Sequence, residues 1–239
     1  MKMTQEINDL YAELAQREIA KRSFADYLVL AQGKTWKRTR LSEFLANKVQ
    51  EFVETETDNA YDILIIECPP QHGKSTTITE SFPSWYMGKH PMNSVILASY
   101  NKDFSEKFNR RNKEKIRALG VDLFGVGIGA IDRADEFELD NAKGRLISRG
   151  IMSGITGNPA NLIIMDDPIK NQQEADSPTY RENLWEEWQS SIKTRLAAKA
   201  KVVIILTPWH YDDISARIAR AWDNGVRYQL YPASAARHL

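Results

Sequence analysis

A lysine and a serine close a short turn whose sequence is Cys68-Pro-Pro-Gln-His-Gly-Lys-Ser75. The apolar run Ile63-Leu-Ile-Ile-Glu67 precedes this turn, and a stretch compatible with a helix follows it. Strand, turn and helix in this order are typical of a phosphate-binding P-loop, in which backbone N–H groups and a helix N-terminus face the anion. The turn departs from the pattern G-x-x-x-x-G-K-[ST] only where Cys68 replaces the first glycine.

The residue types in this turn predict a nucleotide site. Lys74 would lie against the β- and γ-phosphates, and Ser75 would offer its hydroxyl to Mg²⁺. The other predicted nucleotide-binding residues of the loop are Pro70, Gln71, His72, Gly73 and Thr76. A degenerate match also arises by chance, so this turn alone leaves an ordinary strand-to-helix connection open.

A pair of acidic residues follows a second strand-like run, Leu162-Ile-Ile-Met165. Two acids at the carboxyl end of a buried strand form a Walker B pattern, in which Asp166 would hold Mg²⁺ and Asp167 would activate the attacking water. The alternative is a buried strand that ends in an Asp-Pro turn at Pro168. Because this pair follows the P-loop pattern in the expected order, the two together favour a site for ATP and Mg²⁺.

A basic helix is predicted after the strand expected at 94–99. Arg110 and Arg111 on this helix are candidates for contacts to DNA phosphates or to a nucleotide. Acidic residues are interspersed with the basic ones, so a balanced, solvated helix face remains the alternative.

Arg149 stands in a glycine-rich segment just before the Walker B run. Gly150, Gly154 and Gly157 predict a mobile loop there. Such a loop would present Arg149 to a nucleotide as an arginine finger, across an interface between subunits. The alternative is a plain flexible connection.

A third buried run, Val202-Val-Ile-Ile-Leu206, ends at Thr207. If this strand neighbours the P-loop strand, the Thr207 hydroxyl would sense the γ-phosphate and couple its presence to the next helix. The alternative is a strand end before the turn-forming Pro208. His210 is followed by two acids, but no second histidine is near, so a metal site is not favoured there.

Composition restricts the class of protein. The chain has 239 residues, of which 42% are hydrophobic, with 32 basic and 32 acidic side chains. This length is sufficient for one sizeable α/β domain, and the balanced charge argues against a general nucleic-acid coat. Cys68 is the single cysteine, which favours a reducing compartment. No apolar run approaches the roughly 20 residues of a membrane helix, and no signal peptide is evident, so we expect an intracellular protein without a membrane partner.

Hydrophobic periodicity predicts how the chain is organised. Helical spacing covers about 4–31 and 41–53, and alternating strands and helices begin after a polar loop at 55–59. The expected strands are 62–67, 94–99, 137–140, 145–148, 162–166, 202–207 and 226–231, and the expected helices are 74–88, 102–118, 177–197 and 212–223. This alternation predicts an α/β fold with a mainly parallel sheet flanked by helices. We therefore expect an N-terminal helical segment, 1–58, and a P-loop core, 59–239.

The chain resembles the ATPase domain of the large terminase subunit of tailed phages, the motor that packages DNA into procapsids. The resemblance rests on CPPQHGKST (68–76), SYNKDFSEKFNRR (99–111), ITGNPANLIIMDDPIKN (155–171), EADSPTYRENLWEEWQSSIKTRL (174–196) and LTPWHYDD (206–213). It covers about 24–232, and Pro-Pro-x-His-Gly-Lys-Ser is characteristic of the family, so Cys68 fits. The family often has an arginine where Pro208 stands and a basic residue where Asn158 stands.

The resemblance implies an ASCE-type P-loop NTPase that hydrolyses ATP with Mg²⁺ and moves double-stranded DNA. The implied partners are double-stranded DNA, a portal protein, a small terminase subunit and further copies of the chain in a ring, with a monomer as the alternative in isolation. The implied location is the cytoplasm of the infected bacterial host. Large terminases usually continue into an RNase-H-like nuclease domain, and this sequence stops at Leu239 without one, so we expect no nuclease activity.

Three alternatives remain at this level. A helicase-like DNA-dependent ATPase would need a second RecA-like motor domain. A P-loop kinase would need an arginine-rich lid and an acceptor pocket. A nucleotide-binding protein without turnover would have no use for the second acid, Asp167.

Overall fold

The structure, a computed structural model, describes residues 2–140, 142–153, 155, 157, 159–221 and 226–231. Its strands are β1 (Tyr61–Glu67), β2 (Val95–Ser99), β3 (Ile128–Asp132), β4 (Glu136–Leu139), β5 (Arg145–Gly150), β6 (Ala160–Asp166), β7 (Leu196–Leu206) and β8 (Val226–Tyr231). Its α-helices are α1 (Lys2–Arg22), α2 (Phe24–Gln32), α3 (Arg40–Glu54), α4 (Lys74–Thr77), α5 (Phe82–Lys89), α6 (Lys102–Lys115), α7 (Val121–Phe124), α8 (Gln172–Asp176), α9 (Pro178–Glu187) and α10 (Ile214–Arg220).

One sheet organises the described strands, in the order β3-β4-β5-β2-β6-β7-β1-β8. Along this order, each pair of neighbouring strands from β5 through β2, β6, β7 and β1 to β8 is parallel. At the other edge, β3 pairs antiparallel with β4, and β4 with β5. The predicted α/β fold with a mainly parallel sheet is therefore confirmed. β7 lies between β1, the predicted P-loop strand, and β6, the predicted Walker B strand.

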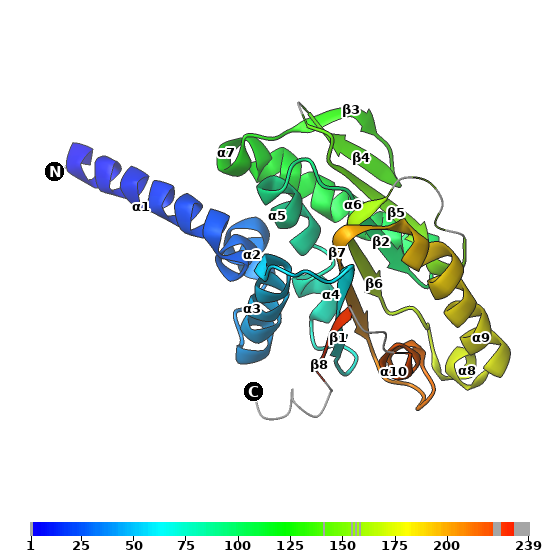
Figure 1. Ribbon diagram of the computed structural model, residues 1–239. Coiled ribbons are helices and arrows are strands. Elements are labelled where there is room, and N and C mark those ends of the chain that lie inside the picture. Colours follow the sequence, from blue (N-terminus) through cyan, green and yellow to red (C-terminus); the bar gives the residue numbers. More distant parts are fainter. Residues whose placement is uncertain are drawn as a thin grey trace.

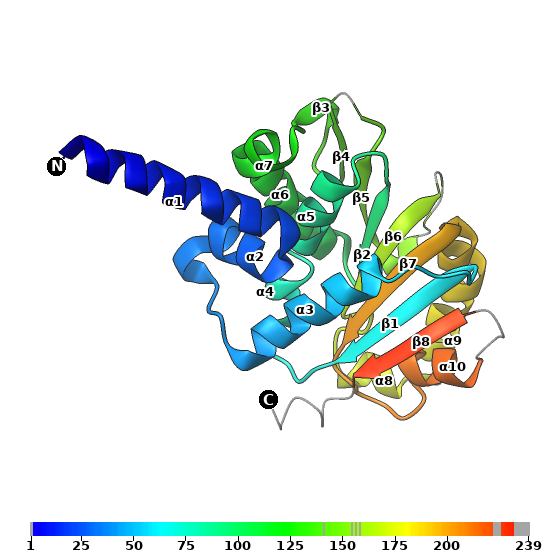
Figure 2. The same ribbon diagram turned by 60° about the vertical axis from the view of Figure 1, so that its left-hand side comes forward.

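Helices cover both faces of the sheet, as Figures 1 and 2 show. Successive strand side chains point to opposite faces, so Leu64 and Ile66 join one core while Ile63 and Ile65 join the other. The first core is closed by α2, α3, α5 and α6, and the second by α9, the π-helical turn at Trp188–Ile192, and α10. This double cover explains why the central strands are apolar without alternation.

Three expected helices differ from the prediction. The helix expected at 4–31 is two helices, because Ser23 leaves the helical conformation and its hydroxyl accepts the N–H of Asp26 as an N-cap. The helix expected at 74–88 is interrupted, because Pro83 has no N–H to continue it and instead lies in the first turn of α5. The helix expected at 177–197 ends early, since β7 already begins at Leu196.

The N-terminal helices share a core with the sheet. Phe24 of α2 packs against Phe82 and Trp85 of α5, with ring centroids 4.9 and 5.6 Å apart. Only the base of α1 joins this core, through the buried Ala20, and the rest of α1 projects away from the body (Figure 1). No helix within the described part of the chain is both long and apolar enough to cross a bilayer.

Candidate active site

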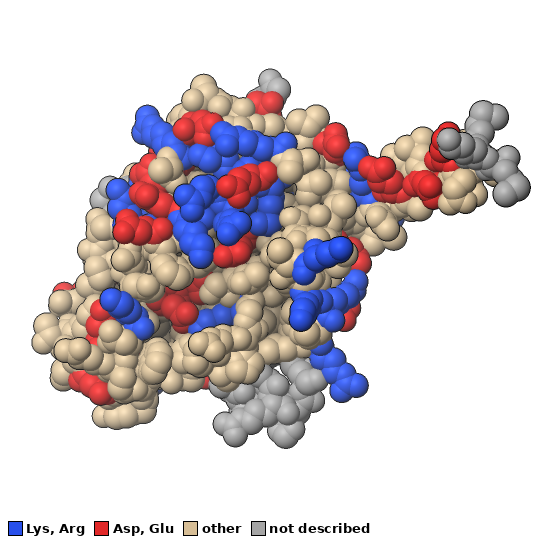
Figure 3. Space-filling model, turned by 180° about the vertical axis from the view of Figure 1, so that it is seen from behind, with Lys and Arg blue, Asp and Glu red and all other residues tan. Residues whose placement is uncertain are grey.

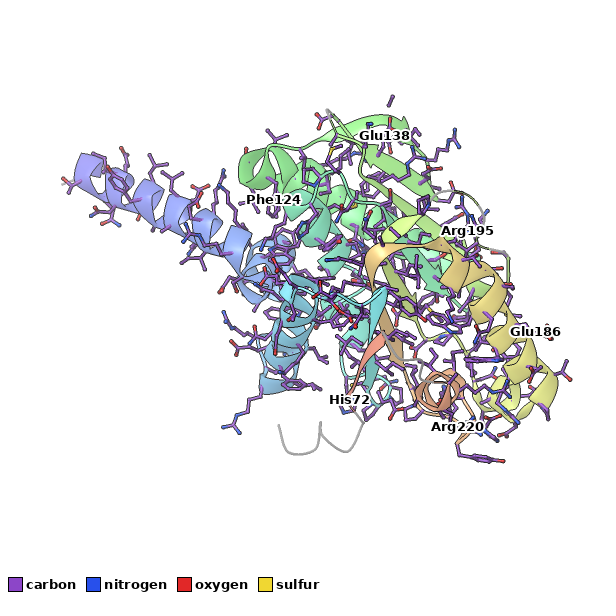
Figure 4. All side chains as sticks on the ribbon, viewed as in Figure 1. His72, Phe124, Glu138, Glu186, Arg195 and Arg220 are labelled. Atoms are coloured by element: carbon purple, nitrogen blue, oxygen red, sulfur yellow. The ribbon has the colours of Figure 1, made fainter. Side chains whose placement is uncertain are left out.

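The turn after β1 holds its lysine and serine at the carboxyl edge of the sheet. Gly73 adopts φ 73°, a left-handed conformation that favours glycine, and caps α4. Gln71 is also left-handed, with φ 63°. Left-handed residues at these two positions are compatible with a loop whose backbone N–H groups bind an anion. Figure 4 shows His72 of this loop and Arg220 of α10 near the lower edge of the molecule, whereas Arg195, just before β7, lies far from them.

The structure brings the two predicted metal-holding residues together. The Ser75 hydroxyl donates to Oδ1 of Asp166 at 3.0 Å. The second carboxylate oxygen, Oδ2, is buried and has no hydrogen-bond partner among the described residues. Burial, and then the neighbouring Asp167 carboxylate, raise the pKa of Asp166 to about 7.

A hard divalent cation fits this pair of groups. An orphaned carboxylate oxygen beside a serine hydroxyl offers the oxygen ligands that Mg²⁺ prefers. Mg²⁺ usually keeps several waters and takes one or two protein oxygens plus substrate phosphates, so a larger cage is not required. Within the described residues, no group of three or more His, Cys, Asp or Glu side chains is arranged to hold a metal.

Lys74, Asp167 and Thr207 converge from three elements. The Lys74 ammonium is buried and donates to Asp167 Oδ1 at 2.7 Å and to Thr207 Oγ1 at 2.6 Å. The Thr207 N–H also donates to Asp167 Oδ1, at 3.1 Å. Asp167 adopts φ 44°, which is strained for a residue other than glycine and is typical of functional positions. β7 pairs with β1, so the condition under which Thr207 would lie beside the P-loop is met.

The raised pKa of Asp166 predicts a pH-dependent stability. The folded carboxyl holds its proton up to about pH 7, whereas the unfolded one releases it near 3.8, so its stabilising contribution is present at pH 4 and lost as the pH rises through 7. Asp166→Asn is therefore expected to raise the free energy of unfolding at pH 8, by up to about 4 kcal/mol, and to give no such gain at pH 4.

Urea unfolding without metal or nucleotide measures this difference. Mg²⁺ added at pH 8 is expected to stabilise the parent protein and to leave Asp166→Asn unchanged. An identical pH dependence in the two proteins would show that the Asp166 carboxyl is not the titrating group.

A cleft of about 240 Å³ opens beside these acids at the carboxyl ends of β2, β6 and β7. Its wall includes Ser99, which lies opposite Asp166 in the β2–β6 register and whose buried hydroxyl has no partner among the described residues. Aromatic and cationic side chains complete the wall: Tyr100, Phe104, Trp209 and Lys170. Nothing in the local sequence indicated that Phe104 or Lys170 would line this cleft.

Arg149 is not in a mobile loop, so that expectation was wrong. It lies in β5, where Ala98 of β2 is its register partner, because strand pairing with β2 extends through Gly150. Its guanidinium donates to Asp135 Oδ2 at 2.8 Å and to the Ser148 carbonyl. Gly154, which was expected to lend that loop mobility, lies outside the described residues.

Arg110 and Arg111 lie exposed on α6, away from the Lys74–Asp167 pair. No ion pair joins either guanidinium to a carboxylate in the described part of the chain. Arg111 lines a groove between α2 and the end of α6, whereas Arg110 does not. Neither arginine therefore belongs to the cluster of Lys74, Ser75, Asp166, Asp167 and Thr207.

The comparisons with known proteins agree with this geometry. A family model described as terminase large subunit, T4likevirus-type, N-terminal, matches residues 65–229. The chain belongs to this family. A search of curated proteins found no sequence that matches this chain. Large-terminase structures resemble its fold: a point mutant of the ATPase domain of the Thermus phage P74-26 large terminase has 12% identity and a TM-score of 0.53 over 85% of this chain and 86% of that one.

Two longer terminases also match. The large terminase of bacteriophage D6E has 11% identity and a TM-score of 0.50, covering 85% of this chain and 48% of that one. The large terminase of bacteriophage HK97 has 10% identity and a TM-score of 0.51, covering 82% and 40%. At these identities the likeness concerns the fold. This terminase chain spans less than half the length of both proteins.

Proposed function

We propose that the chain is the ATP-hydrolysing domain of a terminase large subunit and that hydrolysis drives double-stranded DNA into a procapsid. The observation that carries this proposal is the convergence of Lys74, Ser75, Asp166, Asp167 and Thr207 at one edge of the sheet. Family membership favours a packaging motor over a helicase-like ATPase, a kinase or a binding protein without turnover.

Different side chains of the site would have different roles in ATP hydrolysis. Lys74 and the N–H groups of the loop from Pro70 to Thr76 would stabilise the charge that develops on the transferred phosphoryl group. A bound γ-phosphate is a stronger partner for the Lys74 ammonium than Asp167 is, so the Asp167 carboxylate would be released to take a proton from water. Ser75 and Asp166 would hold Mg²⁺, which neutralises phosphate charge when bound.

Thr207 is proposed to report the γ-phosphate to the rest of the domain. Its hydroxyl touches Lys74, and the loop that follows leads to Asp212, which forms ion pairs with Arg181 of α9 and Arg217 of α10. A change at Lys74 therefore has a physical route to both helices.

Thr207→Val removes the hydroxyl and keeps the shape. We expect ATP binding to be retained and turnover to fall about tenfold, since one hydrogen bond to a charged group is lost. Nucleotide binding measured by fluorescence and phosphate release measured separately distinguish the two effects. Unchanged turnover in this variant would remove Thr207 from the site.

Arg149 is kept as the proposed arginine finger, acting on the site of a neighbouring copy. To reach a neighbour's nucleotide its guanidinium must leave Asp135. In an assembled ring, Arg149→Ala is expected to lower turnover about 10³-fold or more. Mixing these subunits with Lys74→Ala subunits, which retain Arg149, should recover part of the activity. If Arg149→Ala rings are as active as the parent, another arginine acts.

The proposed partners are duplex DNA, a portal protein, a small terminase subunit and further copies of the chain, in the cytoplasm of an infected bacterium. Arg110 and Arg111 are the proposed contacts to DNA phosphates on α6. The test is the steady-state ATPase rate of the purified chain with and without linear duplex DNA, portal-bearing procapsids or both. The proposal predicts a rate increase that requires both additions. A rate that is indifferent to DNA in the presence of procapsids would contradict it.

A further inference from the structure

Helix α1 presents an apolar stripe that nothing in the described structure covers. Ile7, Leu10, Tyr11 and Leu14 recur at helical spacing and are 48%, 56%, 69% and 49% exposed. Among the described residues the helix is held at its base alone, where Arg17 pairs with Asp122 and Trp85 donates to the Ala20 carbonyl. The backbone hydrogen bonds of a helix alone contribute little net stability in water, and most helices are stabilised by burying their apolar face. An apolar stripe that stays exposed is therefore typical of a binding surface.

The charges beside the stripe argue against pairing of two α1 helices. Glu6 lies four residues before Leu10 and Glu13 three residues after it, so both carboxylates border the stripe. Between residues 4 and 16 the helix has three acids, counting Asp9, and no base, and Arg17 in the next turn pairs with Glu13. Two such helices packed along their stripes would bring like charges together. The partner surface should therefore combine apolar side chains with cations.

The chain itself carries such a surface. A groove of about 430 Å³ lies between α2 and the end of α6, with Leu30, Ala31, Ala118 and Leu119 as apolar walls. Arg111 and Lys115 line it, together with Glu80 and Glu114. Burial lowers the pKa of Lys115 to about 8, and its ammonium has only a 3.4 Å bond to the Arg111 carbonyl.

The charged residues that line the groove cancel, and the excess of cations lies beside it on the exposed face of α6. On α6, Lys107 and Arg110 join Arg111 as exposed cations without an ion pair in the described part of the chain. Figure 3 shows Lys and Arg, with Asp and Glu interspersed, gathered on the face of the body opposite to the view of Figure 1, while α1 projects away from this patch. A chain's own α1 is fixed at its base and points away, so only another copy's α1 would occupy the groove.

We propose that the apolar stripe of α1 packs into the α2–α6 groove of a second copy of this chain. The donor surface and the acceptor groove are different parts of the molecule, so the contact is head-to-tail, and such contacts form rings when the rotation closes. The ring itself rests on the proposed function, whereas the contact is testable without ATP turnover.

Sedimentation velocity of the full chain over a range of concentrations tests the contact. The parent is expected to self-associate beyond a dimer. Leu10→Asp with Leu14→Asp should weaken association about a hundredfold or more, because apolar anchors are lost. The matched control is Ala12→Asp with Gln16→Asp, which places the same charges on the opposite, exposed face of the same helix. The control should associate as the parent does.

A charge exchange identifies the acceptor. Glu6→Lys and Arg111→Glu should each weaken association about three- to tenfold, and the chain with both changes should regain it. Glu6 is chosen because Glu13 is already paired with Arg17 of its own helix. The proposal is overturned if the parent stays monomeric, which is the result expected if α1 binds some other protein. It is also overturned if the double exchange fails to recover association, or if association stops at a dimer.

Lys74→Ala keeps every α1 and groove residue and separates the two proposals. Its self-association should equal that of the parent even though its ATPase activity is lost. Self-association with an ATPase that stays silent even with DNA and procapsids would contradict the proposed function alone. An ATPase stimulated by DNA and procapsids, in a chain that stays monomeric in solution, would contradict the α1 contact alone.

Discussion

Lys74→Ala is expected to reduce ATP turnover about a thousandfold or more, since the ammonium supplies several kcal/mol of stabilisation to the transferred phosphoryl group. The lysine is buried at the start of α4, and both of its partners, Asp167 and Thr207, belong to the same site. Its ammonium is therefore already positioned at the mouth of the loop, where a γ-phosphate would take the place of the Asp167 oxygen.

Phosphate release under saturating ATP measures this loss. The control is Lys102→Ala, an exposed lysine at the start of α6 whose removal should leave turnover unchanged. Circular dichroism and thermal unfolding establish that both variants are folded. A folded Lys74→Ala protein with near-parental turnover would remove Lys74 from catalysis.

Asp167→Asn is expected to bind ATP and Mg²⁺ but to hydrolyse about 10²- to 10⁴-fold more slowly, because an amide cannot take a proton from water. Asparagine tolerates the left-handed φ of this position as well as aspartate does, so the strained backbone should survive the change. The lost activity would then report chemistry and not misfolding.

Binding and turnover must be measured on the same preparation of Asp167→Asn. Equilibrium binding of a fluorescent ATP analogue should match the parent to within a few-fold, while single-turnover hydrolysis should be slow. Parental hydrolysis by this variant would show that another group activates the water.

Local sequence was sufficient to predict the ends of the central strands. Runs such as Leu162–Met165 are apolar throughout because both faces of the sheet are covered, and the acids that follow must then lie at its carboxyl edge. The residues predicted at that edge, Lys74, Ser75, Asp166 and Thr207, do meet there.

The sequence pattern could not predict which strands and side chains pair over long distances in the chain. The Lys74–Asp167 bond depends on β7 lying between β1 and β6, and no local pattern fixes the strand order. The glycines near Arg149 predict a loop, yet Arg149 lies in β5 because this strand pairs with β2. The edge strand β3 was not predicted, because Ile-Gly-Ala-Ile-Asp has a weak strand signal that antiparallel pairing with β4 overrides.

A structure of this chain with Mg²⁺ and a non-hydrolysable ATP analogue tests the central claim most directly. The predicted result is that the Lys74 ammonium leaves Asp167 for the β- and γ-phosphates, with Mg²⁺ held between the Ser75 hydroxyl and Asp166. Nucleotide bound away from the 70–76 loop, or a Lys74–Asp167 bond that persists beside bound nucleotide, would contradict it.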